Sequence, residues 1–183
     1  VEIVNGKGRI LVNTQPKIGI DLQASVRTAA LVAENFTGFS LANSDIIVSV
    51  YSDEPVEVID GPSAGAAITS AIIAAIWGNT LNKTVYITGT INPDGSIGSV
   101  GGVLEKAIAA AEAGASLFLV PVGESTVYVQ VPVEYKIAPG ITIIVYENVK
   151  VDLEGYLVEH GYNMRVIEVS NIFEAYNYMV ARE

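Results

Sequence analysis

A long apolar segment from Ala64 to Trp77 is the feature that most constrains what this chain can fold into. The segment is rich in alanine and isoleucine, and Gly78-Asn79 follows it as a plausible helix stop. It is shorter than the ~18 residues that a bilayer-spanning helix needs, and Thr69 and Ser70 interrupt it. We therefore predict a buried helix, around which the rest of the chain has to build a core.

Strand-like and helix-like segments share the rest of the chain, and half of all residues are hydrophobic, so a sizeable core is available. We expect Asp21 to cap the first helix and Ser170 to cap the last one. The mixture predicts an α+β (α/β mixed) fold, with mixed sheets and packed helices in one compact domain over residues 1–183. The expected strands are 8–13, 45–51, 84–91, 96–100, 117–120, 126–133, 141–146 and 165–169, and the expected helices are 21–35, 64–77, 103–113, 151–160 and one after Ser170.

Charge and composition exclude several classes of function. The net charge is −10 and the lysines and arginines do not cluster, which argues against a nucleic-acid partner. The chain has no cysteine, which excludes thiol catalysis, disulfides and thiolate metal sites, and its single histidine excludes a His-rich metal centre. We therefore expect no metal site.

The stretch DGPSAG, residues 60–65, contains the pattern Gly-x-Ser-x-Gly, which presents a serine nucleophile in α/β-hydrolases. In that case His160 would be the base and Asp94 or Asp152 the acid. The context disfavours this triad, because no His-Gly-Gly loop precedes Ser63 and His160 lies at an expected helix end. Ser63 can equally be an N-cap or a small residue in a tight turn. Its place at the start of a helix, where N–H groups point outward, also suits an oxyanion.

Lysine is the other residue type that can take a proton from serine, provided that it is neutral and has no adjacent carboxylate. Lys106 lies in GGVLEKAIAAAEAGA, the best-defined helical segment. Its neighbours three and four positions away are glycine, valine and alanine, none of which can form an ion pair with it. Taken alone, Lys106 still fits better as a lysine that extends its amine into solvent from the edge of a buried helix.

Together, these two segments resemble the proteolytic domain of the Lon protease family. DGPSAG is followed by ITGTINPDGSIGSVGG and then by the lysine of GGVLEKAIAAAEAG, in the order and at the spacing typical of that family. ASLFLVP continues the resemblance, and VIEVSNIFEAYNYM is similar to the closing strand and helix of the family. The strong part of the resemblance covers about Val58 to Pro121.

The resemblance implies a Ser-Lys dyad on a Lon proteolytic-domain-like fold. Ser63 would attack the peptide carbonyl, while Lys106, as a neutral amine, would take its proton and pass it to the leaving amine. Thr88, in YITGT, would hydrogen-bond near the lysine and hold its amine in place. Asp60 would bind Lys106 when the site is idle, or cap the helix. The turn and the oxyanion hole would be formed around Ser63 by Gly61, Pro62 and Ala64.

The resemblance also implies partners and an assembly. The substrates would be unfolded proteins or flexible peptides, and the subunits would form a ring, expected to be a hexamer. The dyad needs no metal or organic cofactor. ATP would be needed only by a separate AAA+ ATPase domain, because GNTLNKT at 78–84 lacks the second glycine of a phosphate-binding loop. We therefore expect either the protease part of such a protein or a stand-alone, archaeal-type relative.

The chain departs from the family pattern in the strand before the serine, where Ser49 and Tyr51 stand in place of the histidines of many bacterial members, and in a long later segment. The segment 123–162 is longer than the corresponding stretch, which predicts an added hairpin or helix that gates the site, contacts a neighbouring subunit or has no function. The chain does not begin with Met, so we expect a fragment or processed form, with room for an ATPase domain or a membrane anchor outside it. A cytoplasmic or membrane-anchored location fits better than export, but the sequence does not decide between them.

Two other functions stay open at this point. The first is a non-catalytic ring-forming assembly or binding module that retains the fold. The second is an esterase that uses Ser63, His160 and an aspartate. The esterase would lose activity in a His160→Ala variant, whereas the Lon-like protease would lose it in a Lys106→Ala variant.

Overall fold

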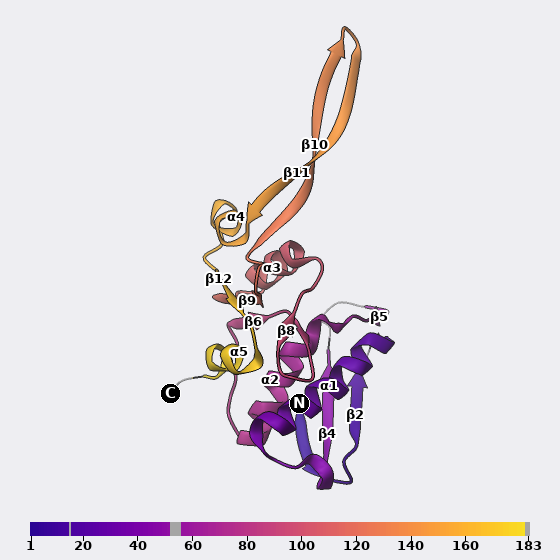
Figure 1. The fold of residues 1–183 in the computed structure, drawn as a ribbon, viewed down its shortest axis with the longest axis vertical. Coiled ribbons are helices and arrows are strands. Elements are labelled where there is room, and N and C mark those ends of the chain that lie inside the picture. The colour runs from indigo at the N-terminus through magenta and orange to yellow at the C-terminus, as the bar shows by residue number, and fades with distance from the viewer. Residues whose placement is uncertain (15, 52–55, 182–183) are drawn as a thin grey trace.

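The apolar segment forms α2 (Gly65–Trp77), as predicted, and its buried residues belong to the largest core. The computed structural model describes residues 1–14, 16–51 and 56–181 (Figure 1). The hydroxyls of Thr69 and Ser70, both buried, donate to carbonyls four residues earlier in the helix, at 2.7 and 2.9 Å. The two polar residues that interrupt the apolar segment are therefore satisfied within the helix. Among the described residues, no helix is both long enough and apolar enough to cross a bilayer.

On one side, α2 packs against α1 (Ile20–Thr37), which lies beside a mixed three-stranded sheet (Figure 1). The central strand, β4 (Ser44–Val50), pairs antiparallel with β1 (Glu2–Asn5) and parallel with β2 (Ile10–Thr14). A 3₁₀ turn, η1 (Leu41–Asn43), leads from α1 into β4. Buried side chains of α1, α2 and β4 share the large core.

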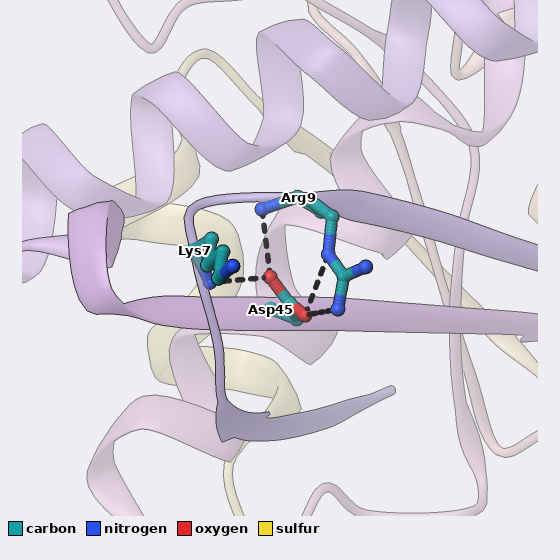
Figure 2. Close-up of polar contacts among 3 residues, drawn as sticks. All are labelled: Lys7, Arg9 and Asp45. Carbon is teal, nitrogen blue, oxygen red and sulfur yellow. Dashed lines mark hydrogen bonds and ion pairs between the residues drawn. The ribbon is translucent and has the colours of Figure 1, made fainter.

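The carboxylate of Asp45 ties the loop between β1 and β2 to the sheet (Figure 2). It accepts hydrogen bonds from the backbone N–H groups of Lys7 (2.8 Å) and Arg9 (2.9 Å) and from the Arg9 guanidinium. The side-chain bond from Arg9, followed by the backbone bonds, holds the pKa of Asp45 far below its ordinary value. A Cβ at Gly6 would lie 2.1 Å from the Asp45 carboxyl carbon, so only glycine allows this approach. We assign a structural role to this pair.

A second sheet of three parallel strands separates the large core from a smaller one. Its central strand is β9 (Leu117–Pro121), on which Leu119 faces the large core, whereas Phe118 and Val120 belong to the smaller core. Because both faces are covered, the stretch LFLV is apolar throughout, as predicted for a short buried strand. The strands, in sheet order, are β12 (Arg165–Val169), β9 (Leu117–Pro121) and β6 (Val85–Ile87).

The smaller core is formed with α3 (Val103–Glu112) and α4 (Leu153–Glu159). Between β6 and α3, the strands β7 (Thr90–Ile91) and β8 (Ile97–Gly98) pair antiparallel around the predicted turn. Mixed sheets and packed helices together confirm the α+β fold class.

The last helix, α5 (Ile172–Met179), packs against α2 in the large core. Its N-cap is Asn171, whose side chain accepts from the N–H of Glu174 at 3.0 Å. Ser170 instead donates to the Glu174 carboxylate. The prediction that Ser170 caps this helix is therefore wrong by one residue.

The segment 123–162 contains a long antiparallel hairpin of β10 (Thr126–Ala138) and β11 (Ile141–Asp152), which projects from the body (Figure 1). Both strands run further than predicted, and α4 begins only at Leu153. The pairing register gives the hairpin two unlike faces. One face, which we call the valine face, consists of Val127, Val129, Val131, Val133, Ile143, Val145, Val149 and Val151, with Tyr135 bonded to Glu147 among them.

Candidate active site

The turn around Ser63 begins at Gly61, whose φ of +108° lies in a region that side chains rarely adopt. No atom of the described residues lies within 4 Å of a Cβ built at Gly61, so backbone conformation rather than space requires the glycine there. Pro62 opens the 3₁₀ turn η2 (Pro62–Ala64), which runs directly into α2. The half-buried Ser63 therefore sits just before a long helix, at a point where free N–H groups favour negative charge.

Hydrogen bonds fasten this turn to the chain that follows β6. The carbonyl of Ser63 accepts from the N–H of Gly89 at 2.9 Å and from the hydroxyl of buried Thr88 at 3.4 Å. The N–H of Ala66 donates back to the carbonyl of Gly89 at 3.1 Å. Ser63 is therefore held at the carboxyl end of a parallel strand, the edge at which sites gather in such sheets.

Gly65 allows the start of α2 to approach its neighbours closely. A Cβ at this position would lie 2.8 Å from both the Ile91 side chain and the Ser25 hydroxyl, and 2.9 Å from the backbone nitrogen of Ile91. Backbone atoms cannot give way as a flexible side chain would. In the Gly-x-Ser-x-Gly pattern, backbone conformation thus requires the first glycine, Gly61, and close packing requires the second, Gly65.

Asp60 caps a helix, but not the one that follows Ser63. Its carboxylate accepts from the N–H groups of Asp21 (3.1 Å) and Leu22 (3.2 Å), at the start of α1. A Cβ at Gly19, the N-cap of α1, would lie 1.9 Å from the Asp60 carboxyl carbon. Pairing of β3 (Lys17–Ile18) with β5 (Val58–Ile59) brings the two segments together. The prediction that Asp21 caps α1 is therefore wrong, because the cap comes from a residue distant in sequence.

Lys106 lies on α3, and its amine donates to the carbonyl of Gly101 at 2.7 Å. Burial is the main influence on this group and lowers the pKa of Lys106, while the charges of Glu124 and Glu105 act in the opposite direction. Among the described residues, no carboxylate lies within ion-pair distance of this amine. A lysine in this setting gives up its proton more readily than an ordinary surface lysine.

The two halves of the expected dyad are not joined by a hydrogen bond in the part of the chain that the structure describes. The Lys106 amine is bonded to Gly101, and the Thr88 hydroxyl is directed to the Ser63 carbonyl rather than to the amine. Sequence reasoning did not single out Gly101 or Glu124. The signal that points to Glu124 is its place just beyond the carboxyl end of β9.

The residues of the alternative triad are each engaged locally. His160, exposed at the end of α4, donates through Nδ1 to the Tyr156 carbonyl at 2.7 Å. Asp152 accepts from the Gly155 N–H at 2.7 Å, and Asp94 accepts from Ser96. Across residues 1–14, 16–51 and 56–181, no group of three or more His, Cys, Asp or Glu side chains could hold a metal ion.

Residues 2–159 match the family model of the Lon protease (S16) C-terminal proteolytic domain. The chain belongs to this family. The Lon proteolytic domains are serine proteases, and the match runs through the serine turn, α3 and the hairpin. Similar proteins include the Lon protease of Dictyoglomus thermophilum, 30% identical over 96% of this chain and 21% of the relative. The archaeal Lon protease of Methanothermobacter thermautotrophicus is 28% identical over 85% of this chain and 23% of the relative.

The chain thus spans about a fifth of the length of these Lon proteases. A third relative, the Lon protease of Elusimicrobium minutum, is 33% identical over 66% of this chain and 14% of its own length. The family assignment therefore covers the proteolytic part of such proteins.

Proposed function

We propose that this chain is a serine endopeptidase domain in which Ser63 is the nucleophile and Lys106 the general base. The observation that carries the proposal is the setting of Lys106, whose pKa burial lowers and whose amine has a backbone carbonyl, rather than a carboxylate, as its partner. The fixed serine turn at the start of α2 adds support.

The proposed reaction needs only groups of the chain and water. The Ser63 oxygen attacks the peptide carbonyl carbon as its proton passes to the neutral amine of Lys106. The resulting oxyanion accepts hydrogen bonds from the backbone N–H groups of Ser63 and Ala64, because Pro62 has no N–H and that of Gly61 donates to Asp60 at 2.8 Å. The ammonium then protonates the leaving amine, and water, activated by the same lysine, hydrolyses the acyl-enzyme.

A movement of Lys106 is part of this proposal. On binding of a substrate, the Lys106 amine would leave the Gly101 carbonyl and bond to the Ser63 hydroxyl. The Thr88 hydroxyl supports the serine turn by donating to the backbone carbonyl of Ser63. We propose that it also approaches the amine in this second arrangement.

The proposed substrates are unfolded proteins and flexible peptides, with no cofactor in this domain. ATP would act only through a separate ATPase domain. The test is hydrolysis of an unfolded, fluorescently labelled protein without ATP, by the wild type and by Ser63→Ala, Lys106→Ala and His160→Ala variants. We expect activity to be lost in the first two and kept in the third. If Lys106→Ala stayed active while His160→Ala lost activity, the result would favour the esterase-type triad. A wild-type protein that is folded but inactive would favour a binding module.

We also propose that copies of this chain assemble into a ring, and the valine face supports a contact between neighbouring subunits. A two-stranded ribbon is marginal alone in water, and an apolar face needs a second layer. Val145 and Ile144 are both exposed and lie on opposite faces of β11. We expect Val145→Lys to reduce assembly in light scattering, whereas Ile144→Lys leaves it unchanged. An equal effect of both variants would contradict a role of this face.

A further inference from the structure

Glu124 has a carboxylate near the proposed base, and the reaction described above does not use this carboxylate. It follows β9, and its Oε1 accepts from the backbone N–H of Val100 at 3.0 Å. Its other oxygen, Oε2, is buried and has no hydrogen-bond partner among the described residues. A buried acceptor without a donor lowers the stability of the folded state, so the presence of this one calls for an explanation.

One short segment connects this carboxylate to the proposed base. Glu124 holds the N–H of Val100, and the next residue, Gly101, provides the carbonyl that accepts from the Lys106 amine. The charge of Glu124 opposes the effect of burial on the pKa of Lys106, and Glu105 on α3 is the second carboxylate that acts on it.

Glu124 also lines a hollow of about 380 Å³. Glu124 and Glu105 line it together with Val100 at the entry to α3. Val127 and Tyr128, at the base of the hairpin, line it as well. Glu124 therefore borders a hollow at the base of the hairpin and is linked to the proposed base through the Val100–Gly101 segment.

We propose that Glu124 is a positioning residue that holds the Val100–Gly101 segment and keeps the protonated Lys106 in its resting arrangement until a substrate draws the amine to Ser63. The inference rests on the proposed Ser-Lys dyad. A protonated lysine has three N–H donors, of which Lys106 uses one at Gly101. The charge of Glu124 attracts this ammonium without an ion pair between the two among the described residues, and once the amine loses its proton, this attraction ends.

The test separates the charge of Glu124 from its hydrogen bond to Val100. Glu124→Gln keeps an oxygen acceptor for that N–H but removes the charge, whereas Glu124→Ala removes both. Glu105→Gln removes the other neighbouring charge without touching the segment and serves as the matched control. The measurements are kcat/KM against pH and, in a Ser63→Ala background, NMR titration of the Lys106 amine, which needs no activity.

For Glu124→Gln we expect kcat/KM on the acid side of the profile to rise about threefold or more, because the neutral amine becomes more populated. The alkaline plateau should stay within about twofold of the wild type, whereas Glu124→Ala should lower it by more than that. Profiles and NMR titrations that coincide for the wild type and Glu124→Gln would overturn the inference, as would an equal change in Glu105→Gln. If Lys106→Ala proved active, the dyad itself would fail, and the NMR titration would still decide what Glu124 does to this amine.

Discussion

The two halves of the proposed site are held in different ways. The serine half consists of η2, the first turn of α2 and the Thr88-Gly89 pair. It is fastened by backbone hydrogen bonds and lies against the large core. The lysine half consists of α3, the segment 99–102 and Glu124, and it belongs to the smaller core. Among the described residues, its reactive group is held by one bond, to the Gly101 carbonyl.

This difference suits the two tasks that the halves would perform. An oxyanion hole made of backbone N–H groups works only if the backbone is fixed before the reaction, because any reorganisation adds to the barrier. A base has to change its proton and its partner in every cycle, so a single bond to a neutral carbonyl suits it better. The rigid half should therefore be sensitive to packing changes, and the lysine half to changes of charge.

The largest effect should come from adding a methyl group to the serine half. In Gly65→Ala, the new Cβ would meet backbone atoms of Ile91, and we expect a loss of about 1–3 kcal/mol in the free energy of unfolding. Gly101→Ala is the matched change in the lysine half, where no atom in the described part of the chain lies within 4 Å of the added carbon. We expect a change below about 0.5 kcal/mol there. Urea unfolding measures both, and equal losses would remove the contrast between the halves.

A smaller effect is expected when the Asp60 carboxylate, which joins the serine half to α1, is removed. Asp60→Ala removes the cap of α1 and should cost about 1 kcal/mol in the free energy of unfolding. Asp21→Ala, in the first turn of the helix, should cost less than Asp60→Ala because, among the described residues, the cap of α1 comes from Asp60 and not from Asp21. The pH midpoint of peptidase activity should stay unchanged in Asp60→Ala. A shift of that midpoint would instead place Asp60 next to Lys106.

The smallest effect is expected from Thr88→Val, which removes a long hydrogen bond to the Ser63 carbonyl. We expect a loss of about 0.5–1 kcal/mol in the free energy of unfolding and a kcat lowered by a few fold. A loss of activity comparable to that of Lys106→Ala would show that the Thr88 hydroxyl does far more than support the serine turn.

The elements with strong local signals could be predicted from the sequence. The helix over 64–77 has an apolar composition and a glycine stop, and Gly78 ends α2 with a φ of +69°. The strand LFLV and the turn between β7 and β8 also depend on neighbouring residues, and both are present. Short-range periodicity and turn chemistry determine such elements, so a single sequence contains the information.

Contacts between residues that are distant in sequence could not be predicted from such local patterns. The cap of α1 comes from Asp60, which only the pairing of β3 with β5 brings to that helix. The hairpin is longer than predicted because each strand is stabilised by its partner, so Pro132 is accepted opposite Tyr146. The sequence singled out Ser63 and Lys106 through the family resemblance. Glu124 and Gly101 become visible only when the chain beyond β9 is placed against the entry to α3.

The most direct test of the central claim is the rate at which a fluorophosphonate labels Ser63, read by intact-protein and peptide mass spectrometry. If Lys106 activates Ser63, the wild type should form one adduct at Ser63. Its rate should rise with pH around a midpoint below the ~10.4 of free lysine. Lys106→Ala should be labelled at least about 100-fold more slowly, and His160→Ala at the rate of the wild type. Labelling of Ser63 in Lys106→Ala at the wild-type rate would contradict the account.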